Sequence, residues 1–259
     1  MKLMIFQIDA FSKKLFGGNP AAIIPLKEWI NDTVMQKIAL ENNLSETAFF
    51  VRKGNTMHIR WFTPTQEVDL CGHATLACAF LIFDKMKWPH NEIVFDSKSG
   101  TLRVTKEGSK LVLDFPSEVP ESCAVPTGLE EALGMKIVSI AKNVDYIVEL
   151  ESETAVKECA PEMRDLAKIE TRGVCITAKG KSVDFVSRFF APRYGIEEDP
   201  VTGSAHTQLT PFWADKLNQT SFHTKQLSKR GGELWCELDG DRVKIAGQAV
   251  RYMEGAIEV

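Results

Sequence analysis

The sequence nearly repeats itself about half a chain apart. The matching segments are Arg60–Pro64 with Cys71–Thr75 in the first copy, and Arg188–Pro192 with Thr202–His206 in the second. The offset between the copies is 128 residues at Arg60 and Arg188, and it becomes 131 residues at Gly72 and Gly203 because the second copy has three extra residues. The repeat predicts two similar lobes, and the cleft between two lobes is a common place for a small-molecule site.

Each copy reads as strand, loop and helix. Residues 56–62 alternate between apolar and polar side chains, as a half-buried strand does, and residues 183–190 are the matching strand. Residues 74–86 are apolar around nearly the whole helix circumference, which predicts a helix surrounded by protein. The partner helix, 205–217, is more polar and contains Pro211, where we expect a kink.

These elements predict an α+β protein with two pseudo-symmetric lobes. Each lobe is expected to wrap a barrel-like, mostly antiparallel sheet around one buried helix. Residues 116–126 are rich in proline, glutamate and serine and therefore predict the boundary. We assign residues 1–117 to the N-terminal lobe and 118–259 to the C-terminal lobe, and we allow the final strand to cross back to the first lobe.

Composition excludes several classes of partner. The 31 lysines and arginines are balanced by 35 aspartates and glutamates, so no basic excess favours nucleic acid or an anionic membrane. The longest apolar run, residues 76–83, is far too short to span a membrane, and the N-terminus does not resemble a signal peptide. The six cysteines show no metal-binding spacing, which predicts no metal site and a cytoplasmic protein with reduced thiols.

Two glycines mark the expected helix starts. Gly72 and Gly203 each permit a positive φ or a close backbone approach. The free amides that follow them would carry the positive end of a helix dipole, so two such ends in one cleft would hold a carboxylate or a phosphate. In the alternative interpretation Ser204 caps its helix and Gly72 makes a turn; the duplication favours the anion site.

Several polar side chains near these starts could transfer protons. His73, in the first turn of a buried helix, should have a pKa lowered by the dipole, which leaves a neutral imidazole. Glu46 directly precedes an apolar strand, where partial desolvation would raise its pKa into the range of a general acid or base. A structural histidine and a solvated glutamate are the respective alternatives.

Asp199 and Cys71 precede the two glycine positions. Asp199 is either a reactive carboxylate or an ordinary partner of the helix dipole. Cys71 could act as a thiolate base at a helix N-terminus. The second copy has Thr202 in place of Cys71, so a symmetric mechanism with two thiols is excluded.

Four motifs, in this order, closely resemble those of the PhzF-like isomerase family of phenazine biosynthesis. They are Phe16–Ala22, Asn43–Phe49, Cys71–Thr75 and Asp199–His206. The resemblance runs from about Gln7 to Val250 and implies the diaminopimelate epimerase-like fold, with the site between two pseudo-symmetric lobes.

The resemblance also implies roles for individual residues. Glu46 matches the acid/base glutamate of the family, while His73, Asp199 and Ser204 match residues that surround the substrate and assist the transfer. The Gly72 and Gly203 segments match the carboxylate cradle, and Asn19 matches a Gly-Asn-Pro motif near the cleft. The related amino-acid epimerases use one cysteine on each lobe, whereas this chain has only Cys71 at these positions.

Three functions compete at this point. The first is a cofactor-independent isomerase, which moves a proton between carbons of a small carboxylate-bearing metabolite with Glu46 as acid/base. The second is an amino-acid epimerase or racemase that uses Cys71, and the third is a non-catalytic metabolite-binding protein. The sequence has no nucleotide fingerprint and no lysine motif for pyridoxal phosphate, so we expect no cofactor. The family resemblance suggests a homodimer.

Overall fold

The computed structural model describes residues 1–259 and divides into two compact units. Unit 1 contains residues 1–114 and 246–259, and unit 2 contains residues 115–245. The expected boundary was 117/118, and the structure assigns the last 14 residues (246–259) to unit 1. Helices and mostly antiparallel strands occur in both units, which confirms the α+β class.

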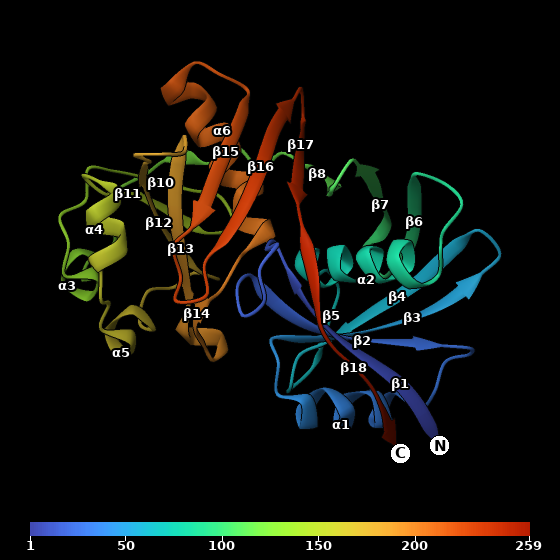
Figure 1. The fold of residues 1–259 in the computed structure, drawn as a ribbon. Helices are drawn as coiled ribbons and strands as arrows, with labels where there is room; N and C mark the ends of the chain where they lie inside the picture. The colour runs from blue at the N-terminus through green and yellow to red at the C-terminus, as the bar shows by residue number, and fades with distance from the viewer. The chain divides into compact units, whose positions relative to one another are not determined.

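Unit 1 is built around strands at both ends of the chain (Figure 1). Its elements are β1 (Lys2–Ala10), β2 (Asn19–Leu26), α1 (Asp32–Asn42), β3 (Glu46–Lys53), β4 (Thr56–Phe62), β5 (Glu67–Val68), α2 (Gly72–Lys85), β6 (Glu92–Ser97), β7 (Gly100–Glu107), β8 (Lys110–Pro116) and β18 (Ala249–Glu258). The unit boundary falls near the end of β8. Strand β18 pairs antiparallel with β1, so the two chain ends lie side by side.

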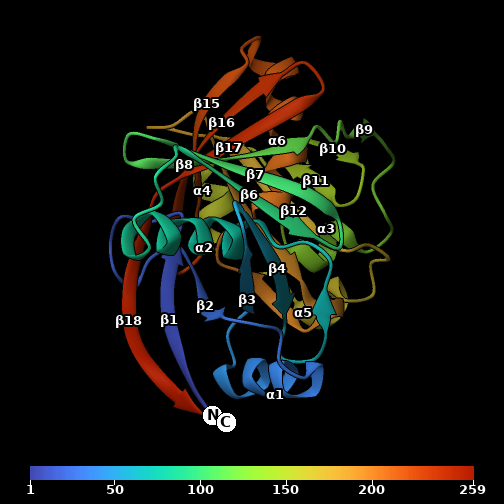
Figure 2. The ribbon, with the colours of Figure 1, turned by 90° about the vertical axis from the view of Figure 1, so that its right-hand side faces the viewer.

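Helices α1 and α2 lie on opposite sides of strands β1–β4 (Figure 2). Helix α2 is apolar nearly all round, and the residues from His73 to Ala79 are all buried. Helix α1 covers the other side with Met35, Ile38 and Ala39. Burying α2 removes more apolar surface from water than a one-faced helix would, so α2 is a major source of the stability of unit 1.

Unit 2 contains the remaining elements. They are β9 (Glu121–Ser122), α3 (Leu129–Leu133), β10 (Ser139–Lys142), β11 (Tyr146–Glu149), α4 (Glu153–Glu158), α5 (Met163–Leu166), β12 (Val174–Lys179), β13 (Phe185–Ala191), the 3₁₀ helix η1 (Pro192–Tyr194), β14 (Ile196–Asp199), α6 (Gly203–Leu217), β15 (Ser221–Gln226), β16 (Gly232–Asp239) and β17 (Arg242–Gly247). Helix α6 is its counterpart of α2, and nine of its 15 residues are buried.

The strand pairing repeats in the two units. In unit 1, β2–β3 is parallel, β3–β4 antiparallel, β4–β6 parallel and β6–β7 antiparallel. In unit 2 the same alternation is made by β11–β12, β12–β13, β13–β15 and β15–β16. The repeat in the sequence therefore corresponds to a repeat in topology.

The two repeated arginines perform the same task in their own units. Arg60 on β4 forms a two-bond ion pair with Glu67 and uses its third nitrogen for Asp32, at the start of α1. Arg188 on β13 forms the same ion pair with Glu198 and uses its third nitrogen for backbone carbonyls at the end of α4. Each guanidinium thus ties an outer helix to the sheet, and two-bond arginine–carboxylate pairs fix orientation well.

Helix α6 continues through Pro211 as one helix. Proline lacks an amide hydrogen, so the carbonyl of Thr207, four residues earlier, loses its helical partner. This carbonyl accepts instead from the backbone amide of Glu118 at 3.1 Å. The proline therefore provides an attachment point for the segment that follows β8.

The tight connection between β1 and β2 depends on Gly18. Gly18 has a φ of +68°, and a Cβ atom there would lie 2.1 Å from the carbonyl oxygen of Ala10. Gly108, in the β7–β8 turn, has a φ of +60° but no atom within 4 Å of the corresponding position.

We therefore predict that Gly18→Ala and Gly108→Ala differ strongly in stability. Gly108→Ala should cost about 1–2 kcal/mol, the strain of a left-handed alanine alone. Gly18→Ala should cost clearly more, because a backbone clash adds to the same strain. Urea unfolding of both variants measures the difference, and equal losses would contradict the role given to the Ala10 contact.

Candidate active site

The first cluster, in unit 1, consists of Glu46, Cys71 and His73. Glu46 is the first residue of β3, its side chain is 14% exposed, and its Oε2 lies 3.2 Å from Nε2 of His73. The other ring nitrogen of His73, Nδ1, lies 3.5 Å from Sγ of Cys71. The structure thus brings these three predicted residues together and excludes a solvated glutamate.

His73 is a neutral imidazole. Its burial lowers its pKa to about 3, since a protonated ring would be costly away from water. We expected the helix dipole to be the cause, and burial is the cause found. Glu46, Cys71 and His73 each offer one ligand atom within 4.8 Å of the others, and Zn²⁺ accepts a carboxylate, an imidazole and a deprotonated thiol as ligands.

The start of α2 has no side-chain cap. Cys71 occupies the N-cap position in an extended conformation, and its side chain makes no capping hydrogen bond. Gly72 is the first helical residue and does not adopt the positive φ that we considered, so it does not form a left-handed turn. The first amides of a helix have no partner within the helix, and here no side chain of the N-cap residue takes their place.

Asn19 is fully buried at the start of β2, opposite Ala10 of β1. It belongs to unit 1, as the first cluster does. Its assignment to substrate binding stays a prediction.

The second cluster, in unit 2, consists of Asp199, Thr202 and Ser204. Asp199 ends β14, and its Oδ2 accepts a hydrogen bond from Oγ1 of Thr202 at 2.5 Å. Gln226 fixes this loop, because its Oε1 accepts from the Thr202 amide and its Nε2 donates to the Asp199 carbonyl. Asp199 is therefore held by the loop before α6.

Ser204 does not cap α6. It is the second residue of the helix, and Thr202 stands at the N-cap without a side-chain capping bond. Ser204 is partly exposed. Gly203, like Gly72, has no positive φ. The alternative interpretation, in which Ser204 only caps the helix, is therefore wrong.

The carbonyl of the N-cap residue is satisfied in the same way in both units. In α2, Oγ1 of Thr75 donates to the carbonyl of Cys71 at 2.6 Å. In α6, His206 takes the place of Thr75 in the repeat, and its Nδ1 lies 2.8 Å from the carbonyl of Thr202. His206 is fully buried, and burial lowers its pKa to about 4. We assign it a structural role.

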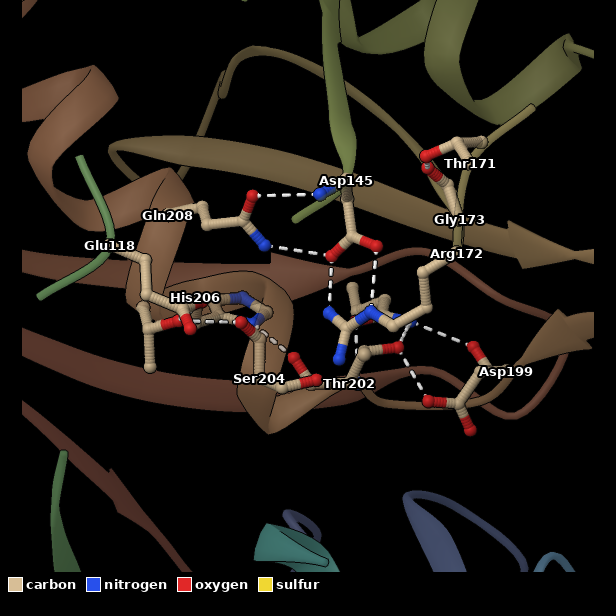
Figure 3. Close-up of polar contacts among 12 residues, drawn as sticks. Glu118, Asp145, Thr171, Arg172, Gly173, Asp199, Thr202, Ser204, His206 and Gln208 are labelled. Atoms are coloured by element: carbon tan, nitrogen blue, oxygen red, sulfur yellow. Dashed lines mark hydrogen bonds and ion pairs between the residues drawn. The ribbon is translucent and has the colours of Figure 1, made fainter. Parts of the chain in front are cut away.

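A buried network of polar side chains connects Gln208 of α6 with Asp145 and Arg172 (Figure 3). Asp145 is fully buried; both of its carboxylate oxygens accept from the Arg172 guanidinium, and Nε2 of Gln208 donates to it at 2.7 Å. Gln208 also accepts from the Asp145 amide. Burial lowers the pKa of Arg172, but the bonds and charge of Asp145, with the charges of Glu118 and Asp199, outweigh it and raise the pKa.

Sequence reasoning did not find this network. Asp145 and Arg172 lie outside the four motifs and are separated from Gln208 in the sequence. One usable signal was the spacing within the expected helix: Gln208 follows Ser204 by four residues and so lies on the same face of the helix. The charge of Asp145 is compensated by partners from two other segments, which a local pattern does not reveal.

The comparisons with known proteins agree with one another. A family model described as phenazine biosynthesis-like protein matches residues 8–255. The chain belongs to the phenazine biosynthesis-like family. An uncharacterized isomerase of Pseudomonas aeruginosa is 52% identical over the full length of both chains. The predictions of the family and of an isomerase are confirmed at this level.

Solved structures support the fold. A phenazine biosynthesis protein of the PhzF family from Enterococcus faecalis has a TM-score of 0.98, with 45% identity and complete coverage of both chains. A hydroxyproline epimerase from Agrobacterium vitis has a TM-score of 0.64 at 7% identity, covering 99% of this chain and 92% of its own, and shows likeness of fold alone. The expected epimerase-like fold is confirmed. None of the helices has the length and apolar content needed to cross a membrane.

The depressed pKa of His73 makes stability depend on pH. The unfolded chain takes up a proton near the ordinary pKa of about 6.5, whereas the folded ring does so only at about 3. Between these values the unfolded state binds more protons, so stability falls as the pH falls. We expect His73 to contribute a loss of about 2 kcal/mol between pH 7 and pH 5.

Urea unfolding of the wild type and His73→Gln at pH 7 and at pH 5 measures the contribution of His73 to this loss of stability. The variant should lose less stability on acidification than the wild type. His90→Gln, at an exposed position, is the matched control and should behave as the wild type does. An identical pH dependence in His73→Gln would contradict the burial argument.

The network in unit 2 gives a second stability prediction. Arg172→Gln leaves the buried Asp145 carboxylate with only Gln208 as a side-chain partner, and we expect a cost of about 3 kcal/mol. That is the low end for such losses, because the Arg172 side chain is 37% exposed. The double variant Asp145→Asn with Arg172→Gln should recover part of the loss, and a double-mutant cycle in urea measures it. Purely additive losses would show that the two side chains are not coupled.

Proposed function

We propose that this protein is a cofactor-independent isomerase that moves a proton between carbons of a small carboxylate-bearing metabolite. Glu46 is the acid/base. The observation that carries the proposal is the contact between the sheltered carboxylate of Glu46 and the neutral imidazole of His73, at the start of buried α2. The names of the relatives, uncharacterized isomerases, agree with this class.

The chemistry follows from the groups present. The Glu46 carboxylate removes a proton from a substrate carbon; the C–H bond breaks, an O–H bond forms and the electron pair spreads into an enol or dienol system. Glu46 then returns the proton to a second carbon, which completes the isomerisation. Fixed donors stabilise the negative charge that develops in between.

We assign the anion-binding role to the uncapped helix starts. The Gly72 and Gly203 segments each precede amides that have no partner within the helix, and amides at such positions bind carboxylates. The hydroxyl of Ser204 adds a donor next to Gly203, and Asp199 is the second carboxylate available for proton transfer. The duplication of these features supports an anion-binding role for each helix start, and Asn19 is a further binding residue in unit 1.

An epimerase that uses Cys71 is the second candidate. The place of Cys71 at the start of α2 favours it, since a helix N-terminus stabilises a thiolate. The equivalent residue in unit 2 is Thr202, so the mechanism would need a partner that is not a thiol. A cytoplasmic location and a homodimer stay predictions from the sequence.

Proton NMR in D₂O tests the proposal. The substrates are a panel of cyclic and acyclic carboxylates that includes 2,3-dihydro-3-hydroxyanthranilate. We expect deuterium uptake or isomer formation with the wild type and a loss of about 10²–10⁴-fold with Glu46→Gln, the usual contribution of a general acid or base. Glu41→Gln, exposed on α1, is the matched control and should retain full activity.

The remaining outcomes decide between the candidates. Undiminished turnover in Glu46→Gln would rule out the assigned role. Loss of stereoinversion in Cys71→Ser, with Glu46→Gln active, would favour the epimerase. Tight binding of a panel member without exchange of any ligand proton would indicate a non-catalytic binding protein.

A further inference from the structure

Cys71 and Thr202 hold the same place in the repeat and depart from the usual behaviour of an N-cap residue. An N-cap side chain normally accepts a hydrogen bond from the first turn of its own helix. Neither side chain does so here. Cys71 instead contacts Nδ1 of His73, and Thr202 donates to the Asp199 carboxylate.

We propose that Cys71 is a positioning residue that sets the tautomer of His73. Its S–H group donates to Nδ1, so the single ring proton of the neutral imidazole resides on Nε2 and faces Glu46. The role in catalysis rests on the proposed function of Glu46, whereas the tautomer itself does not.

The position of the ring proton follows from the donors and acceptors that face the two ring nitrogens. A neutral imidazole has one N–H and one acceptor nitrogen, and an ionised carboxylate only accepts. Oε2 of Glu46 lies 3.2 Å from Nε2 without the geometry of a regular hydrogen bond, and attraction between this carboxylate and a ring N–H favours the proton on Nε2. Nδ1 is then an acceptor, and the group next to it, at 3.5 Å, is the Cys71 thiol.

Because Cys71 and His73 are buried, Nδ1 of His73 depends on the thiol of Cys71 for a hydrogen-bond donor. Cys71 and His73 are 7% and 6% exposed, so little water is available to satisfy Nδ1 if the thiol is removed. A buried acceptor without a donor is costly, and the ring can avoid this cost by moving its proton to Nδ1. Nε2 would then present a lone pair to the Glu46 carboxylate, which is unfavourable for holding Glu46 in its basic form.

The hydrogen bond of Thr202 in unit 2 agrees with this role of an N-cap side chain as a donor. Its hydroxyl donates to Asp199 at 2.5 Å, in the direction that an ionised carboxylate requires. Both N-cap side chains therefore act as hydrogen donors beside an acid/base candidate. Because these two side chains are directed elsewhere, they accept no hydrogen bond from the first amides of α2 and α6.

The test is the tautomer of His73, read from long-range ¹H–¹⁵N correlation spectra of protein labelled with ¹⁵N-histidine. The chain has five histidines, and the signals missing in His73→Gln identify the ring. We expect the proton on Nε2 in the wild type and in Cys71→Ser, whose hydroxyl is also a donor. Cys71→Ala should lose this single tautomer. Cys78→Ala removes another buried thiol of α2 and should leave the His73 signals unchanged.

Two outcomes would overturn the proposal. A wild-type proton on Nδ1 would show that Cys71 accepts rather than donates, and it would favour the thiolate-base mechanism. A Cys71→Ala protein that retains the pure Nε2–H form would show that the thiol does not set the tautomer. Backbone amide spectra confirm that each variant is folded, and the wild-type spectrum alone decides the first outcome. Because no substrate is used, failure of the isomerase assay leaves this measurement interpretable.

Discussion

The hydrogen-bonding needs of the first amides of α2 and α6 constrain the structure around these two helices. Both helices are largely buried, and a buried helix must still find partners for its first amides, because amides shielded from water are costly when unpaired. Ordinary helices meet this demand with a serine, threonine or aspartate at the N-cap. Here the N-cap side chains are directed to other groups, and in the proposed function the carboxylate of the substrate takes their place.

Much of the surrounding structure holds these starts in place. In unit 2, Gln226 fixes the loop before α6, and the Asp145–Arg172 pair holds the helix through Gln208. In unit 1, the burial of α2 itself performs this task. The two units hold these helix starts by different means, although Arg60 and Arg188 make the same kind of ion pair in each unit.

The sequence predicts the helices and strands that follow from hydrophobic periodicity and from the repeat. The apolar circumference of residues 74–86 predicts α2, and alternation in residues 56–62 predicts β4. The motif residues Glu46 and His73 were identified, and the structure brings them into contact. The Asp145 network was not predicted, because its members come from three separate segments that meet only after folding. The cause of the low His73 pKa was also missed: local sequence reveals a helix start, whereas burial depends on the whole unit.

Pro211 illustrates how a residue that weakens one element can join two. By lacking an amide hydrogen it leaves the Thr207 carbonyl available, and the Glu118 amide occupies it. The side chains add to this backbone attachment, because Oγ1 of Thr207 also lies 2.8 Å from Oε2 of Glu118. The interruption of the helical hydrogen bonds at Pro211 thus gives the connecting segment a fixed backbone acceptor within unit 2.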